Sequence, residues 1–288
     1  MTLLNMTIKD ATLFSTGQLS ILYEKGEAST MSDWLIEHLT GIKKTDRISQ
    51  SKKELSAEQE ELLGAYIERL QQYEPIQYIL NEAWFCGLRF YVDKHVLIPR
   101  PETEELVEWI ITGCRFPISE LSILEIGSGS GCIPIALKRR LGKAEVWSCD
   151  VSKDALQVAE KNANNLGVEV NFMQMDFLDQ AQREKLPEFD IIVSNPPYIT
   201  WRERYGMRAN VLEYEPAKAL FVPDNDPLVF YKAIADFGKN HLKPNGSIYT
   251  EINESLGKLT LAMFTENGFQ TELKKDINGK DRMVRARL

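Results

Sequence analysis

The sequence predicts an α/β protein in which a small helical domain precedes a larger domain built on a mostly parallel sheet. Helical spacing of apolar residues marks the first third of the chain, apolar runs of strand length then alternate with amphipathic segments, and the last two runs flank an Asn-Gly turn. Strands that alternate with helices indicate a parallel sheet covered on both faces. We expect a helical domain at 1–83, a β-hairpin linker at 84–100, and the α/β domain with a C-terminal antiparallel hairpin at 101–288.

The composition is that of a soluble globular protein. Of the 288 residues, 43% are hydrophobic and 26% are charged, and the net charge is -8. This acidic balance disfavours broad binding to nucleic acid, which relies on lysine and arginine, although it is compatible with a local basic patch. The opening stretch lacks the features of a signal peptide, and no apolar run has the length of a bilayer span. We expect a cytoplasmic monomer with no stable nucleic-acid or membrane partner.

The cysteines and histidines predict no metal centre. The four cysteines are scattered without a CxxC pair, and the three histidines lie far apart in the sequence. These residues are Cys86, Cys114, Cys132, Cys149, His38, His95 and His241. Reduced thiols are the expected state for such cysteines in the cytoplasm.

Two amphipathic helices are predicted in the first domain. The first has Trp34, Leu35, His38 and Leu39 on one face and ends at Gly41. The face of the second consists of Leu55, Leu62, Leu63, Tyr66, Ile67, Leu70 and Tyr73. Ser56 and Gln59 resemble a capping box at its start. The polar stretch 43–53 predicts a loop, and the aromatic and leucine side chains are predicted to pack in the core.

The elements of the second part follow from the change of periodicity after residue 83. The stretches 84–93 and 95–101 predict a hairpin or a pair of short strands. Strands are predicted at 122–126, 144–149, 169–173, 189–194 and 246–252, and helices at 132–140, 152–166 and 227–241. The runs 268–274 and 282–288 are predicted to pair around Asn278-Gly279.

A glycine-rich loop follows the first predicted strand of the sheet. It reads Glu125-Ile126-Gly127-Ser128-Gly129-Ser130-Gly131. Glycines at alternate positions allow a tight turn and a close approach of the backbone to a ligand. The spacing is GxGxG and not the GxGxxG of dinucleotide sites, and Glu125 would repel a pyrophosphate. A cationic ligand such as the amino end of S-adenosylmethionine matches that carboxylate better, and the alternative is a plain glycine-rich turn.

Acidic residues end the next two predicted strands. Asp150 can accept hydrogen bonds from the two hydroxyls of a ribose, and its alternative role is a helix cap. Asp176 can accept from an adenine amino group, and Phe177 offers an aromatic face beside the ring. Open α/β sheets bind ligands at the carboxyl ends of successive strands. This order of features resembles the class I S-adenosylmethionine-dependent methyltransferase fold.

The fourth strand ends in Asn195-Pro196-Pro197-Tyr198. A proline pair is by itself an ordinary strand terminator. In this place, however, NPPY resembles the motif of methyltransferases that act on planar amide or amino nitrogens. The Asn195 side-chain oxygen and the Pro196 carbonyl could bind the two hydrogens of an amide and orient its nitrogen for methyl transfer. Tyr198 could stabilise the developing positive charge through its ring face.

A second stretch narrows the substrate. Val96-Leu97-Ile98-Pro99-Arg100-Pro101-Glu102-Thr103-Glu104 closely resembles the signature of the PrmC/HemK family. Members of that family methylate the side-chain amide nitrogen (N5) of the glutamine in the GGQ tripeptide of class I peptide chain release factors. Further matching stretches are 75–79, 87–90, 215–216 with 219–220, and 275–279 with Arg282. The chain departs from the family pattern at Glu74, at Asn81 and in the loop 224–228.

The resemblance implies roles for individual residues. Asn195, Pro196 and Tyr198 would be catalytic, and Arg100, Glu102 and Pro197 would join them in binding the substrate. The S-adenosylmethionine site would comprise Pro101, Thr103, Glu125, Gly127, Ser128, Gly129, Gly131, Asp150, Asp176, Phe177 and Asn195. The alternative for Pro101, Glu102 and Thr103 is a helix start.

Two rival functions differ in class from methylation of a protein glutamine. A nucleic-acid methyltransferase must flip its base and contact phosphates, and the negative net charge weighs against it. A non-enzymatic cofactor-binding scaffold is disfavoured by the intact glycine loop and NPPY motif. The sequence leaves open which release factors are modified and how the helical domain docks on them.

Overall fold

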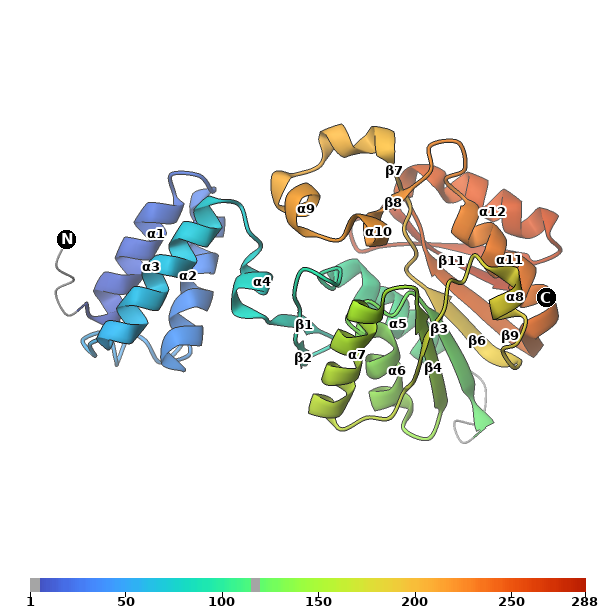
Figure 1. Cartoon of the computed structure of the whole chain (residues 1–288), viewed down its shortest axis with the longest axis horizontal. Coiled ribbons are helices and arrows are strands. Elements are labelled where there is room, and N and C mark those ends of the chain that lie inside the picture. Colours follow the sequence, from blue (N-terminus) through green and yellow to red (C-terminus); the bar gives the residue numbers. More distant parts are fainter. Residues whose placement is uncertain (1–5, 115–119) are drawn as a thin grey trace. The chain divides into compact units, whose positions relative to one another are not determined.

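The computed structural model describes residues 6–114 and 120–288. The chain divides into two compact units (Figure 1). The first consists of the chain up to Glu82 together with Ala209–Tyr214, and the second of Ala83–Arg208 and Glu215–Leu288. None of the helices in these described ranges combines the length and the apolar character needed to traverse a bilayer.

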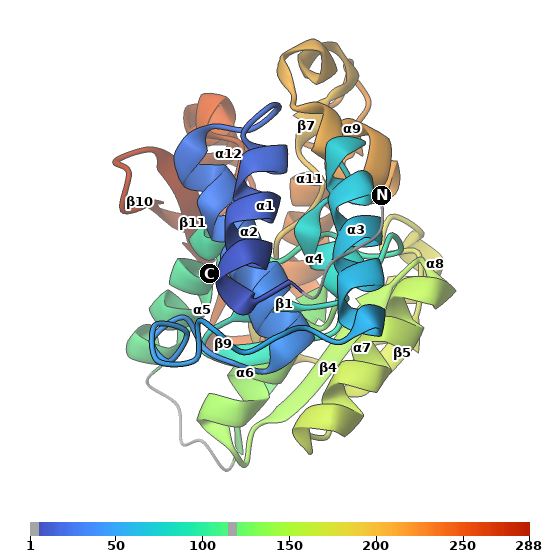
Figure 2. The same cartoon turned by 90° about the vertical axis from the view of Figure 1, so that its left-hand side faces the viewer.

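The first unit is a helical bundle. Its helices are α1 (Ile8–Leu19), α2 (Lys25–Thr40), α3 (Ala57–Gln71), α4 (Ile76–Leu80) and α9 (Ala209–Tyr214). In both views α1, α2 and α3 lie side by side (Figures 1 and 2). The predicted capping box is confirmed, because Ser56 Oγ accepts from the Gln59 amide and Gln59 Oε1 from the Ser56 amide. Gly41 ends α2 in the left-handed region, also as predicted.

The prediction that all the aromatic and leucine side chains of this unit pack in the core is wrong for Trp34, Leu62 and Tyr73. Their exposed fractions are 45%, 38% and 40%. The buried stripe of α2 consists of Ala28, Ser32, Leu35 and Ile36. Trp34 falls beside that stripe, at about 100° from its neighbour Leu35 around the helix. Tyr73 lies beyond the end of α3 with a positive φ of 64°.

The second unit begins with a short hairpin. Strands β1 (Ala83–Phe85) and β2 (Leu88–Phe90) pair antiparallel, with Phe85 opposite Leu88. Cys86 and Gly87 form the turn, and both have positive φ, as a two-residue hairpin turn requires. The predicted hairpin is thus confirmed, but the stretch 95–101 adds no strand to it. Residues 91–100 form no strand, and a turn at 94–96 interrupts them before α5 starts.

A seven-stranded sheet forms the centre of the second unit, in the order β10-β11-β9-β6-β3-β4-β5. The strands are β3 (Ser122–Ile126), β4 (Glu145–Asp150), β5 (Asn171–Gln174), β6 (Phe189–Ser194), β9 (Leu242–Glu251), β10 (Gln270–Lys275) and β11 (Asp281–Arg287). Strands β9, β6, β3, β4 and β5 run parallel to one another. Strand β11 pairs antiparallel with both of its neighbours, β9 and β10. The predicted parallel sheet with its C-terminal hairpin is confirmed. Strand β5 starts two residues later than predicted, and β9 starts directly after α11.

Helices cover both faces of this sheet, as predicted (Figure 1). One face packs against α5 (Pro101–Gly113), α6 (Cys132–Leu141) and α7 (Lys153–Leu166), and the other against α11 (Val229–His241) and α12 (Gly257–Glu266). Ile123 and Ile191 belong to the first core, while their neighbours Leu124 and Ile192 belong to the second. This alternation is the period of two that a strand imposes on a sheet covered on both sides.

The segment between β6 and α11 holds several short elements that the sequence analysis did not predict. They are β7 (Ile199–Thr200), the 3-10 helix η2 (Trp201–Gly206), α10 (Ala217–Leu220) and β8 (Phe221–Val222). Strands β7 and β8 form a two-stranded parallel pair, and Trp201 stacks on Phe221 with ring centroids 4.4 Å apart. Outside this segment, the short helices α8 (Gln180–Arg183) and η3 (Glu254–Leu256) complete the second unit. The chain order reverses at β3, between β4 and β6, which is where open α/β sheets form a ligand crevice.

Candidate active site

A cavity of about 290 Å³ lies at the carboxyl ends of the parallel strands. Seven of the predicted site residues line it. They are Gly127, Gly129, Asp150, Asp176, Phe177, Asn195 and Pro197. The sequence analysis missed the apolar wall, which consists of Val96, Leu97, Val151, Met175, Pro216, Ala217, Ala219 and Phe230 among others. An apolar cavity with a few convergent polar groups is typical of a small-molecule site.

The glycines of the loop after β3 serve two different purposes. Gly127, Gly129 and Gly131 have φ values of 94°, 51° and 78°. A Cβ on Gly127 would meet no atom within 4 Å, so this glycine leaves its side open. A Cβ on Gly131 would lie 2.9 Å from Ile135 Cδ1 and 3.1 Å from Ala159 Cβ. Gly131 therefore permits the close packing of α6 against α7, and it does not line the cavity.

Glu125 lies in β3 beneath the loop and Ser128 in the loop itself, and neither residue lines the cavity. Ser148 Oγ donates to Glu125 Oε2 at 2.5 Å, and Ser128 Oγ lies 2.5 Å from Ser148 Oγ. Burial raises the pKa of Glu125 to about 8, against the opposing effect of the Ser148 hydroxyl. A cation that binds above the loop would favour the ionised form of this carboxyl.

Asp150 both lines the cavity and holds the loop in place. Its Oδ2 accepts from the Gly129 amide at 2.9 Å and its Oδ1 from the Ser152 amide at 2.8 Å. Burial raises the pKa of Asp150, although these amides lower it. The helix cap of α7 is Ser152, whose hydroxyl accepts from the Ala155 amide, so the cap role that was the alternative for Asp150 falls to its neighbour.

Asp176 and Phe177 lie at the end of β5. Asp176 is exposed, and its Oδ1 accepts from the Leu178 amide at 3.0 Å. Phe177 is buried and packs edge to face on Phe237 with centroids 5.3 Å apart. The pair thus presents a polar and an aromatic surface to the same cavity.

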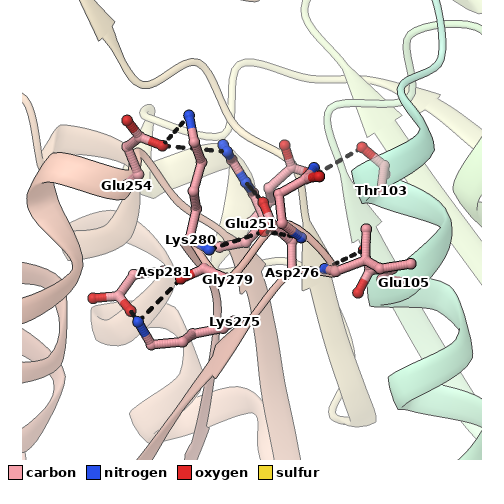
Figure 3. A network of polar contacts seen from close by, with 12 residues as sticks. Thr103, Glu105, Glu251, Glu254, Lys275, Asp276, Gly279, Lys280 and Asp281 are labelled. Carbon is pink, nitrogen blue, oxygen red and sulfur yellow. Dashed lines mark hydrogen bonds and ion pairs between the residues drawn. The ribbon is translucent and has the colours of Figure 1, made fainter.

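The NPPY turn is held by a chain of side-chain hydrogen bonds. Asn195 Nδ2 donates to Thr103 Oγ1 at 3.1 Å, and Thr103 Oγ1 donates to Glu251 Oε2 at 2.6 Å. Tyr198 donates from its hydroxyl to Glu251 Oε1 at 3.1 Å. Figure 3 shows Thr103 on α5 and Glu251 on β9 within one network of polar contacts. Glu251 thus brings together three residues that the sequence analysis singled out.

The sequence analysis missed Glu251. Burial raises the pKa of Glu251, while the hydroxyls of Thr103 and Tyr198 lower it. Burial also raises the pKa of Tyr198, and the charge of Glu251 adds to that effect. The signal that could have found this residue is an acidic side chain in an apolar strand, Ile248-Tyr249-Thr250-Glu251-Ile252, the same signal that marked Asp150.

Residues 98–100 are hydrogen-bonded to Glu215, which follows the NPPY turn in the sequence. Arg100 pairs with Glu215 Oε1 at 2.5 Å, and Glu215 Oε2 accepts from the Ile98 amide at 3.1 Å. Glu215 is buried, with a side chain exposed by only 1%. Two segments more than a hundred positions apart in the sequence therefore form one wall.

Pro101 and Glu102 lie at the first turn of α5, where proline and acidic residues favour a helix start. They line a separate hollow of about 710 Å³, together with Glu104, Glu105, Glu108 and the turn 275–278, and not the cavity at the glycine loop. Thr103 follows them and faces the NPPY turn through Asn195.

Comparisons with known proteins place the chain in a family. The chain matches the PrmC N-terminal domain over residues 19–80 and the methyltransferase small domain over residues 114–214. It is 43% identical to the release factor glutamine methyltransferase of Flavobacterium psychrophilum, over 98% of this chain and 99% of that protein. The chain belongs to the release factor glutamine methyltransferase family.

A second release factor glutamine methyltransferase, from Bacteroides thetaiotaomicron, is 41% identical over 96% of this chain and 98% of its own length. The fold resembles that of a methyltransferase from Pyrococcus furiosus, with a TM-score of 0.51 at 16% identity over 70% of this chain and 89% of that one. The family and the methyltransferase fold predicted from the sequence are confirmed, and the match to the PrmC N-terminal domain lies within the helical first unit.

Proposed function

We propose that this protein transfers the methyl group of S-adenosylmethionine to the side-chain amide nitrogen of the glutamine in the GGQ tripeptide of class I peptide chain release factors. The observation that carries the proposal is the position of Asn195, which lines the cavity while Thr103 holds its amide nitrogen. The relatives named for this reaction, which match the chain over nearly its whole length, support the same conclusion.

The residues around the cavity fit S-adenosylmethionine. Gly127 and Gly129 leave open the space that side chains would fill. Asp150 and Asp176 offer carboxylates to hydroxyl and amino groups, and Phe177 offers an aromatic surface to a base. When bound, this cofactor supplies an electrophilic methyl group on a positively charged sulfur. Glu125 favours a cation by its charge from beneath the loop, and we assign Ser128 and Gly131 to shaping the loop.

The NPPY turn solves the problem of a weak nucleophile. The lone pair of an amide nitrogen is delocalised, so the nitrogen must be oriented rather than deprotonated. Because Asn195 Nδ2 is engaged by Thr103, the Asn195 oxygen is the group left to accept a hydrogen from the substrate amide. The Pro196 carbonyl is the second acceptor, and both dipoles stabilise positive charge on the nitrogen.

Tyr198, Pro197, Arg100 and Glu102 complete the proposed substrate site. The Tyr198 hydroxyl donates to Glu251, so this residue acts through its ring and not as a base. The substrate proton leaves after methylation. Pro197 stiffens the turn. We assign Arg100 and Glu102 to substrate contacts, and Pro101 to starting α5, the helix that carries Thr103.

The remaining assignments are also proposals. Residues 1–83 would recognise the release factor, 84–100 would link the domains, and 101–288 would carry out the transfer. The protein would act in the cytoplasm as a monomer, without a stable nucleic-acid partner.

Incubation with radiolabelled methyl donor tests the function. We expect label in a purified class I release factor, no label in the same factor with the GGQ glutamine replaced by alanine, and none in DNA or RNA. Asn195→Ala should lower the transfer rate by about a hundredfold or more while donor binding persists. Asn165→Ala, at an exposed position on α7, is the matched control. Label only in nucleic acid, or an unchanged rate for Asn195→Ala, would contradict the proposal.

A further inference from the structure

Glu251 is a buried carboxyl that none of the proposed chemical steps uses. It is 1% exposed and lies at the end of β9. One oxygen accepts from Thr103 and the other from Tyr198, and the backbone carbonyl of Glu251 accepts from the Tyr231 hydroxyl at 3.1 Å. Burying a carboxylate is costly unless its oxygens are satisfied, so a carboxyl retained here requires an explanation.

The carboxylate of Glu251 determines the orientation of the Asn195 amide through the hydroxyl of Thr103. A threonine hydroxyl has one proton, and Thr103 gives that proton to Glu251. Its oxygen can then only accept a further bond, and it accepts from Asn195 Nδ2. An asparagine amide has its donor and its acceptor on opposite sides. Fixing the nitrogen toward Thr103 therefore turns the oxygen the other way.

The C-terminal hairpin supports the charge of Glu251. The positive charge of Arg282 lowers the pKa of Glu251, whereas Glu102 raises it. Arg282 Nε in turn donates to Asp276 Oδ2 at 3.1 Å, and Asp276 Oδ1 accepts from the amides of Asn278 and Lys280. Figure 3 shows this turn in the same network as Thr103 and Glu251. The turn 275–279 thus holds Arg282 in place, and the positive charge of Arg282 favours the ionised form of Glu251.

We propose that Glu251 is a positioning residue, whose carboxylate acts through the Thr103 hydroxyl to fix which face of the Asn195 amide meets the substrate. The inference rests on the proposed function and deepens it, because it explains how the acceptor in NPPY is selected over its own donor. Tyr198 is held by the second oxygen of the same carboxylate, so one group aligns both ends of the motif.

Two substitutions of unchanged shape test the inference by steady-state kinetics with a purified release factor. Thr103→Val removes the hydroxyl that connects Glu251 to Asn195. It should lower kcat by about thirtyfold, with the KM for the donor within about threefold of wild type. Thr103→Ser should recover most of that loss. Glu251→Gln replaces a charged acceptor by a neutral one and should lower kcat by about tenfold. Either substitution can carry the test alone if the other variant does not fold.

The double variant separates positioning from two independent losses. Residues that act through one chain give non-additive effects, so Thr103→Val with Glu251→Gln should stay within about threefold of Thr103→Val alone. Thr112→Val, on the exposed side of α5, is the matched control and should leave kcat unchanged. A loss equal to the product of the two single effects, or a kcat for Thr103→Val within about threefold of wild type, would overturn the inference.

A spectroscopic readout distinguishes this failure from failure of the proposed function. In asparagine-labelled protein, the side-chain NH₂ signal that disappears in Asn195→Ala should shift in both Thr103→Val and Glu251→Gln, with no substrate present. A wild-type enzyme that labels no release factor would refute the proposed function alone. An Asn195 signal that ignores both substitutions would refute the positioning role alone.

Discussion

The glycine loop after β3 and the NPPY turn after β6 end neighbouring parallel strands, with Ile126 opposite Ser194, yet they are held by different means. The loop is held mainly by its backbone: three glycines have positive φ, the amides of Gly127 and Ser128 donate to the Cys149 carbonyl, and the Gly129 amide donates to Asp150. The turn is held by two side chains from other elements: Thr103 on α5 binds Asn195, and Glu251 on β9 binds both Thr103 and Tyr198. Backbone shape is a local property of the sequence, whereas a network of this kind is not.

This difference predicts how each region fails. Changes in the loop should alter stability or donor affinity, since the backbone either packs or touches the donor. Changes around the turn should alter kcat, because they reorient groups that meet the substrate.

Gly131→Ala should produce the largest effect. The new Cβ would lie 3.1 Å from Ala159 Cβ, at a φ of 78° that alanine tolerates poorly. We expect a loss of about 3 kcal/mol in the free energy of unfolding, measured by urea denaturation. Gly127→Ala adds backbone strain at a φ of 94° but no steric contact, so it should destabilise the fold less than Gly131→Ala and should also weaken donor binding. Equal stability of wild type and Gly131→Ala would show that this glycine is not a packing residue.

Glu215→Ala should lower the stability of the fold, because Glu215 joins its own segment to the segment that carries Ile98 and Arg100. The substitution leaves Arg100 and the Ile98 amide without their partner. Because Arg100 is partly exposed, we expect a loss of about 2 kcal/mol in the free energy of unfolding, below the range for a fully buried pair. Glu213→Ala, two positions earlier and exposed, is the control. Denaturation curves that coincide for the two variants would contradict the structural role of the pair.

The elements predicted from the sequence share one property, which is that neighbours in the chain determine them. Strands β3 and β6 were predicted to the residue, because each is a short apolar run with polar residues or turns at both ends. The glycine loop, Asp150 and Asp176 follow strand ends and could be found in the same way. Helix α12 was missed, since its apolar residues are not confined to one face and Leu259 is 57% exposed.

The missing part of the site depends on contacts between distant positions. Thr103 and Glu251 are 148 positions apart, and Tyr198 and Glu251 are 53 apart. No periodicity or spacing rule links such residues, so the sequence can mark Glu251 as an acidic residue in an apolar strand but cannot connect it to Thr103 and Tyr198. For the same reason the family resemblance implied a substrate-binding role for Arg100 but could not identify Glu215 as its partner.

Glu125→Gln should change how stability depends on pH. The folded protein raises the pKa of Glu125 to about 8 through burial. An unfolded chain releases this proton at about pH 4.3, so the folded state of wild type loses stability as the pH rises from about 5 to about 8 and then levels off. Glutamine cannot ionise, and the variant should therefore gain about 3 kcal/mol in the free energy of unfolding relative to wild type across that window.

Urea denaturation without donor, at about pH 5 and about pH 8, measures this difference. Glu169→Gln, at an exposed position before β5, should follow the wild type at both values. A difference between Glu125→Gln and wild type that does not change with pH would show that burial of this carboxyl has no cost. At about pH 8 the same variant should bind the donor more weakly, because it lacks the charge of the ionised Glu125, whereas at about pH 5 the wild-type carboxyl is also neutral and the difference should shrink.

Tyr198→Phe should give the smallest effect and is the sharpest test of the turn. The ring stays in place, and only the 3.1 Å bond from its hydroxyl to Glu251 is lost. We expect kcat to fall by about threefold, since one hydrogen bond to the carboxylate goes while the Thr103 branch that holds Asn195 remains. Donor affinity should not change, and Tyr205→Phe, at a position 82% exposed, is the matched control. A loss as large as that of Asn195→Ala would mean that the Tyr198 hydroxyl itself meets the reacting groups. The turn would then act through a proton donor and not through the orientation of its acceptors.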